Sequence, residues 1–219
     1  MPRLPRIDMG DYIYHVINRG TARVQIFYTE EDYDLFELVL EEAQAKFGMR
    51  ILAYCVMPNH WHLVIYPKED GEISKFMKWL TGTHTQRWHA VHGTAGSGHI
   101  YQGRYKSFVV EDDKYLLDLI RYVESNPLHA NLVNRAEEWK WSSLNRRLEQ
   151  CRYLSLLPTE LPANYIESVN QGMSSNNMRK IQTSVVRSKP LGKDEWVQKM
   201  IERFKLQTSI RPRGRNKGT

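Results

Sequence analysis

Two strand-like segments lie only two residues apart in the first half of this 219-residue chain. Ile51 to Met57 (ILAYCVM) and His60 to Tyr66 (HWHLVIY) are rich in β-branched and aromatic residues, and Pro58-Asn59 between them is a turn signal. Parallel strands need a connection of about a dozen residues or more, which excludes parallel pairing here. The spacing therefore predicts an antiparallel hairpin.

Further strand and helix patterns flank this hairpin. Alternation predicts strands over Tyr12 to Asn18 and over Tyr105 to Val110. Helical patterns run from a Thr29 cap to Phe47, from Ile73 to Val91, and from Asp112 or Asp113 to Asn126, where Pro127 favours an end. The order β-α-β-β-α-β-α is that of the ferredoxin-like split βαβ unit plus one extra helix. We therefore expect an α+β fold whose four-stranded antiparallel sheet carries its helices on one face.

The last third of the chain differs in composition. Residues 155 to 190 are rich in Ser, Asn and Thr with weak periodicity, whereas Lys193 to Leu206 has the pattern of an amphipathic helix. The end of the chain is basic. We therefore predict one domain over residues 1–150 and a mainly helical C-terminal extension with a basic tail over residues 151–219.

Composition excludes several classes of protein. The two cysteines, Cys55 and Cys151, are too few for a disulfide scaffold or a Cys-built zinc finger, and they fit a reducing cytoplasm. No apolar run approaches the roughly 18 residues of a membrane helix, and the polar first residues do not resemble a signal peptide. The net charge of +6 favours a polyanionic partner. A cytoplasmic protein with no membrane partner is expected.

His60-Trp61-His62 is the first candidate site. Residues i and i+2 of a strand point to the same side, so the two imidazoles converge while Trp61 points into the core. Two neutral imidazoles form a platform for a divalent metal that needs one more oxygen or nitrogen ligand.

Tyr122 and Asn126 could complete this site. They are four residues apart, hence one turn apart on the same face of a helix. The amide oxygen of Asn126 is a suitable ligand for Mg²⁺ or Mn²⁺, and the phenol of Tyr122 could attack a phosphodiester that the metal polarises. Tyr115 is a rival nucleophile two turns earlier; Leu119, four residues after it, cannot bind metal, although Asp118, three residues after it, could. Tyr122 is therefore preferred.

These motifs in this order resemble the single-tyrosine HUH transposases, and among them the REP-associated tyrosine transposases. The resemblance covers about residues 8 to 145 and is carried by YCVMPNHWHLVIYP, YQGRYKS, YLLDLIRYVESNPLHANLV and WKWSS. His60, Trp61 and His62 match the H-U-H motif of that family, and Tyr122 with Asn126 matches its Tyr-x-x-x-Asn/Gln motif.

The resemblance implies a ferredoxin-like fold and a metal-dependent endonuclease and strand transferase. Its substrate would be single-stranded DNA beside a hairpin, such as a REP-like palindrome. The implied product is a 5′-phosphotyrosine with a free 3′-hydroxyl, which the reverse step can religate. A monomer is expected rather than a dimer, associated with the nucleoid. Two alternatives stay open: a protein that binds structured repeats without cutting them, and a hydrolase that activates water.

Several polar residues are candidates for DNA binding. Asn18 and Arg19 end the first strand, and Arg104 and Lys106 follow a glycine-rich loop whose backbone can approach phosphates. In the tail, Arg211, Arg213 and Arg215 resemble a minor-groove AT-hook, but Asn216 replaces its second proline, which favours non-specific attraction to phosphates. The remaining histidines are interpreted as structural or solvated: His15, His84, His89, His92, His99 and His129.

Overall fold

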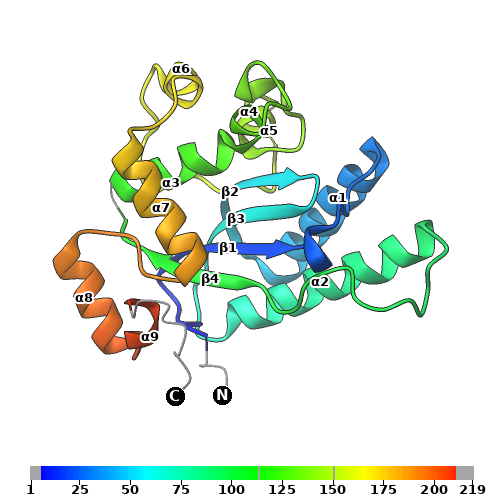
Figure 1. Cartoon of the computed structure of the whole chain (residues 1–219), viewed down its shortest axis with the longest axis horizontal. Helices are drawn as coiled ribbons and strands as arrows, with labels where there is room; N and C mark the ends of the chain where they lie inside the picture. Colours follow the sequence, from blue (N-terminus) through cyan, green and yellow to red (C-terminus); the bar gives the residue numbers. More distant parts are fainter. Residues whose placement is uncertain (1–5, 113, 150, 211–219) are drawn as a thin grey trace, which may run out of the picture.

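The computed structural model describes residues 6–112, 114–149 and 151–210, and it has a four-stranded antiparallel sheet at its centre (Figure 1). The strands are β1 (Ile13–Arg19), β2 (Arg50–Met57), β3 (His60–Tyr66) and β4 (Lys106–Val110). Their spatial order is β2-β3-β1-β4, so the predicted hairpin forms one side of the sheet. The predicted ferredoxin-like α+β fold is confirmed.

Helices account for most of the other regular structure. Those within residues 30–148 are α1 (Glu30–Phe47), α2 (Glu72–Val91), α3 (Lys114–Glu124), α4 (Asn126–His129) and α5 (Ser143–Leu148). Those in the last third are α6 (Tyr165–Asn170), α7 (Ser175–Arg187), α8 (Asp194–Arg203) and α9 (Gln207–Ile210). Short 3₁₀ turns η1 (Thr21–Arg23) and η2 (Ala136–Glu138) lie between them. None of the described helices is long and apolar enough to span a membrane.

One face of the sheet packs on α1 and α2. Alternate strand residues, among them Trp61 and Leu63 of β3, join Phe36 and Leu40 of α1 and Phe76 of α2 in a first core. The N-terminal end of α1 is held by Asp32, whose carboxylate accepts hydrogen bonds from the backbone N–H groups of residues 28 and 29. This layer is the one that the sequence pattern predicts.

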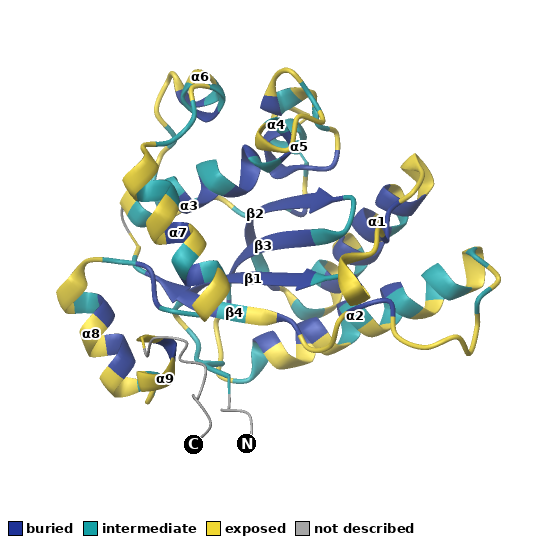
Figure 2. Ribbon diagram, in the orientation of Figure 1, coloured by how far each residue is buried: buried dark blue, intermediate teal, exposed yellow. Residues whose placement is uncertain are grey.

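The other face of the sheet is also covered, so the prediction of helices on one face is wrong. The strand residues that point to this second face, including Cys55 of β2 and Val64 of β3, pack with Leu119 and Val123 of α3 in a second core. The strands are buried along nearly their whole length, as Figure 2 shows. A sheet with apolar residues on both sides requires cover on both sides, and the extra helix α3 provides it.

The third helix ends before Asn126, in contrast to the prediction. α3 stops at Glu124, and Asn126 begins the short helix α4 with Pro127 in its first turn. Proline is tolerated there because the first N–H groups of a helix have no intrahelical acceptor. The backbone nevertheless stays close to helical geometry at Ser125, whose φ is −87° and whose ψ is −2°.

The C-terminal segment packs onto both cores. Tyr165 of α6 and Ile181 of α7 belong to the second core, whereas Met200 of α8 belongs to the first. Leu191 bonds to β4, since its N–H donates to the carbonyl of residue 109 at 3.0 Å. Residues 155 to 190 hold two helices that their weak periodicity did not predict. The proposed boundary at residue 150 stays a prediction.

Candidate active site and cationic groove

His60 and His62 lie side by side on the face of β3 that meets α3. Their ring centroids are 4.9 Å apart. Trp61 points to the opposite side, where it is fully buried and its indole N–H donates to the hydroxyl of Tyr101 at 3.0 Å. In the register of the sheet, Arg19 of β1 pairs with His60. The strand therefore presents two imidazoles beside a guanidinium.

The turn before β3 holds the ring of His60. Its Nδ1 lies 2.6 Å from the amide oxygen of Asn59, while the amide nitrogen of Asn59 donates to the carbonyl of Arg23 at 3.2 Å. An amide oxygen can only accept, so Nδ1 of His60 carries the hydrogen and Nε2 keeps its lone pair. His60 therefore presents an unprotonated nitrogen.

His62 is held by another histidine. Its Nδ1 lies 2.8 Å from Nε2 of His15 on β1, and both rings are buried, with exposed fractions of 1% and 0%. Nε2 of His62 is a buried atom with no hydrogen-bond partner in the described part of the chain. His15 was not predicted as part of the site, because it stands 47 positions before His62 and no local pattern links the two residues.

Both histidines of the motif are kept neutral. Burial lowers the pKa of His60 to about 4 and the pKa of His62 well below its usual value, and the nearby cation of Arg19 acts in the same direction. A neutral imidazole is the form that binds metal.

Tyr122 lies against this pair from α3. Its ring meets that of His62 edge to face, at a centroid distance of 5.8 Å. Burial raises the pKa of the phenol, and the charge of Arg19 opposes the rise. Tyr115 packs against the second core at the start of α3, with the Lys114 ammonium 5.4 Å from its ring centroid.

The residues present fit a divalent cation. The amide nitrogen of Asn126 donates to the carbonyls of Tyr122 at 2.6 Å and Val123 at 3.3 Å, which leaves its oxygen as the atom able to coordinate. Among the described residues, no group of three or more His, Cys, Asp or Glu is arranged to hold a metal. A metal here would rest on Nε2 of His60 and of His62, with further ligands from an amide, substrate or water.

A buried carboxylate fixes α3 in place. Glu124 is fully buried and accepts hydrogen bonds from the hydroxyl of Ser143 at 2.5 Å and that of Tyr165 at 2.6 Å. Arg147 of α5 pairs with the same carboxylate at 3.4 Å. Glu124 follows Tyr122 by two residues in α3. Its bonds to α5 and α6 therefore hold the helix that carries Tyr122 against the sheet of the same chain.

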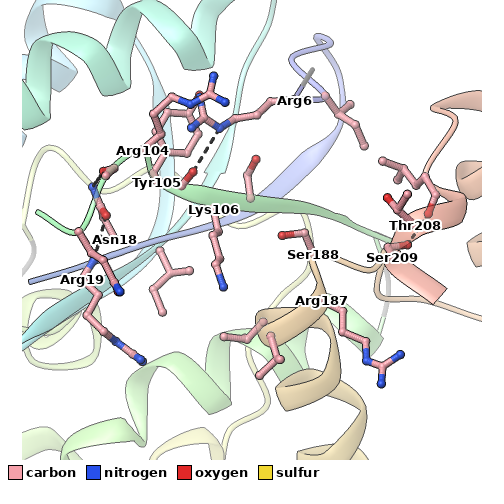
Figure 3. Close-up of a pocket in the computed structure, with 18 of the residues that line it drawn as sticks. Arg6, Asn18, Arg19, Arg104, Tyr105, Lys106, Arg187, Ser188, Thr208 and Ser209 are labelled. Atoms are coloured by element: carbon pink, nitrogen blue, oxygen red, sulfur yellow. Dashed lines mark hydrogen bonds between the residues drawn. The ribbon is translucent and has the colours of Figure 1, made fainter. Parts of the chain in front are cut away.

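A groove of about 680 Å³ has Arg19 among its lining residues (Figure 3). Its walls come from the ends of β1 and β4, the N-terminal segment, and the last residues of α7 and α9. Its cationic lining residues are Arg6, Arg19, Arg23, Arg104, Lys106 and Arg187. No acidic side chain lines it within the described ranges. The groove is therefore suited to a polyanion.

Four residues predicted to bind DNA line this one groove: Asn18, Arg19, Arg104 and Lys106. Arg19 belongs both to the groove and to the surroundings of the histidines, and its buried Nε has no hydrogen-bond partner in the described structure. The predicted tail residues Arg211, Arg213 and Arg215 lie outside the described residues. Arg6, Arg23 and Arg187 were not predicted, since no motif includes them.

Known proteins resemble this chain in sequence and in structure. The family model described as "Transposase IS200 like" matches residues 8–126, more than half of the chain. A protein of Haemophilus influenzae, named as a REP-associated tyrosine transposase, is 21% identical over 145 residues, covering 63% of this chain and 81% of its own.

A solved structure shares the fold. It is described as a REP-associated tyrosine transposase bound to a REP hairpin, with a TM-score of 0.57 and 16% identity. The match covers 80% of this chain and 96% of the other. The family model, which ends at residue 126, takes in the two histidines, Tyr122 and Asn126. Because this model matches more than half of the chain, the chain belongs to the IS200-like transposase family.

Proposed function

We propose that this protein cleaves and rejoins single-stranded DNA beside a hairpin, through a covalent link to Tyr122. The observation that carries the proposal is the meeting of Tyr122 with His62, 5.8 Å apart between ring centroids, at a site that also holds His60 and Arg19. A nucleophile, two neutral metal ligands and a cation for phosphate are the parts that phosphodiester attack requires.

In the proposed step, the Oη atom of Tyr122 attacks the phosphorus in line with the leaving 3′-oxygen. The phosphorus–Oη bond forms as the bond to the 3′-oxygen breaks. The phenolic proton is lost to solvent, and the 3′-oxygen takes up a proton to become a hydroxyl. One phosphodiester replaces another, so attack by the 3′-hydroxyl reverses the step and religates the strand.

Mg²⁺ or Mn²⁺ bound at this site would supply Lewis-acid stabilisation of charge on the phosphate. His60 and His62 would hold it through Nε2, and the amide oxygen of Asn126 would be a further ligand. Arg19 would stabilise charge on the phosphate and favour ionisation of the Tyr122 phenol, since its positive charge opposes the rise in pKa that burial causes. Asn59 keeps the His60 ring in the required tautomer.

The groove and the relatives support DNA as the partner. The solved neighbour is described as bound to a REP hairpin, which supports a hairpin as the element recognised here. The groove is lined by Arg19 and by residues of β4 and α7, and a volume of about 680 Å³ suits a short single-stranded segment rather than a duplex. Because one chain supplies the tyrosine and both histidines, we propose that it acts as a monomer.

The test is a denaturing gel on hairpin oligonucleotides with single-stranded flanks, labelled at either end. With Mn²⁺ or Mg²⁺, the 3′-labelled strand should migrate with the protein, because that fragment keeps the 5′-phosphate. The 5′-labelled strand should become shorter and stay free. Cleavage without protein-linked DNA would favour activated water, and binding without cleavage would favour a non-cutting binder. Either result contradicts the proposal.

Charge removal in the groove should weaken DNA binding. Arg104→Ala and Lys106→Ala should each reduce affinity for the flanked hairpin about 5- to 10-fold, because each removes a phosphate contact. Each should also reduce the slope of log K against log salt concentration by about 0.7.

The matched control is Lys78→Ala, which removes the same charge from an exposed position on α2 outside the groove lining. Fluorescence anisotropy at several salt concentrations gives both quantities. Equal losses for all three variants would show that net charge, and not the groove, attracts the DNA.

A further inference from the structure

The hydrogen bond between two buried histidines of β1 and β3 has a consequence for metal binding. Nδ1 of His62 and Nε2 of His15 are 2.8 Å apart, so a single hydrogen lies between them. The other nitrogen of each ring, Nε2 of His62 and Nδ1 of His15, is buried without a partner among the described residues. Whether Nε2 of His62 can act as a ligand therefore depends on which ring donates.

Two arrangements of this hydrogen are possible. If His15 donates, Nδ1 of His62 accepts, Nε2 carries the remaining hydrogen, and His62 presents an N–H that cannot bind a cation. If His62 donates, its Nε2 keeps a lone pair, and the hydrogen of His15 lies on Nδ1. Each arrangement leaves one buried donor and one buried lone pair without partners. A cation at Nε2 of His62 is compatible with the second alone.

In the neighbouring histidine, His60, a hydrogen-bond partner behind the ring fixes the tautomer. Asn59 can only accept from Nδ1 of His60, and its amide orientation is set by its bond to Arg23. Nε2 of His60 is thus always the free nitrogen. His15 occupies the corresponding place behind His62, and its own ring is held against Phe108 at a centroid distance of 4.8 Å.

We propose that His15 is a positioning residue that accepts the hydrogen of His62 Nδ1 and so presents Nε2 of His62 to a divalent cation. The inference rests on the proposed function, because that function places the cation there. Groups behind ligating histidines fix the ring and its tautomer, and their removal typically lowers metal affinity about 10- to 100-fold.

The experiment measures Mn²⁺ affinity, from free Mn²⁺ by electron paramagnetic resonance, in the whole protein and three variants. His15→Phe keeps an aromatic ring but no acceptor, and should bind Mn²⁺ about 10- to 100-fold more weakly. His15→Gln keeps an acceptor oxygen and should restore most of the loss. His84→Phe is the matched control, since His84 is equally buried and bonded to a tyrosine hydroxyl on the other side of the sheet, and should match the wild type.

Circular dichroism confirms the fold of each variant, and ¹⁵N shifts of labelled histidines report the tautomer. With Mg²⁺ bound, we expect the hydrogen of His62 on Nδ1. Wild-type affinity in His15→Phe, or a folded His15→Gln as weak as His15→Phe, overturns the inference alone. Absence of Mn²⁺ binding to the wild type overturns the metal requirement of the proposed function, and this inference with it.

Discussion

Tyr122→Phe should abolish the protein-linked DNA and reduce strand cleavage by about three orders of magnitude or more. The substitution removes one oxygen atom, and with it the only atom of the side chain able to bond to phosphorus. The ring contact with His62 should survive, so the fold and hairpin binding should be retained. A gel assay of cleavage and a fluorescence-anisotropy measurement of DNA binding, made on the same preparation, separate these two effects.

Tyr115→Phe is the matched control on the same helix. Tyr115 packs against the second core two turns before Tyr122, and loss of its hydroxyl should leave cleavage within a few-fold of the wild type. Loss of the adduct in Tyr115→Phe, with Tyr122→Phe still active, would move the nucleophile by seven residues and overturn the assignment.

Acid should unfold this protein through its buried histidines. Burial lowers the pKa of His15 and of His84 to about 3 in the folded state, against an ordinary value near 6.5 in the unfolded chain. Well above pH 6.5 both rings are neutral in both states. As the pH falls below that value the unfolded state takes up protons first, so stability declines down to the folded-state pKa. As the pH falls from 7 to 5, each ring should lower the free energy of unfolding by about 2 kcal/mol.

Urea unfolding at pH 7 and pH 5 measures this effect. His84→Leu should have a pH dependence weaker than that of the wild type by about 2 kcal/mol, because one of the titrating rings is gone. His89→Asn removes a less buried histidine of the same helix and serves as the control. If the wild type and His84→Leu lose the same unfolding free energy between pH 7 and pH 5, the acid sensitivity does not come from buried neutral rings.

The sequence predicted the sheet because its signals are local. The two-residue turn before His60 and the alternation along β3 determine the hairpin and the side to which His60, Trp61 and His62 point. The helix boundaries around α1 follow from its capping residues in the same way. Each of these features depends on residues close together in the chain.

The second layer of helices depends on contacts between distant residues. Leu52 and Cys55 mark the outer face of β2 as apolar, but alternation also fits a strand whose second side is open to water. The bonds of Glu124 to Ser143 and Tyr165 join residues 19 and 41 positions apart. The pairing of His15 with His62 likewise spans 47 positions. No local pattern encodes these partners.

Peptide mapping tests most directly whether Tyr122 forms the covalent bond with DNA. Trypsin cuts after Lys114, Arg121 and Arg135, which places the two candidate tyrosines in separate peptides, residues 115–121 and residues 122–135. The protein would be trapped on hairpin DNA with Mn²⁺, digested with nuclease and trypsin, and analysed by mass spectrometry. We predict a nucleotide remnant on Tyr122 in the peptide 122–135. A remnant on the peptide 115–121, or on neither peptide when the strand has been cleaved, would contradict the account.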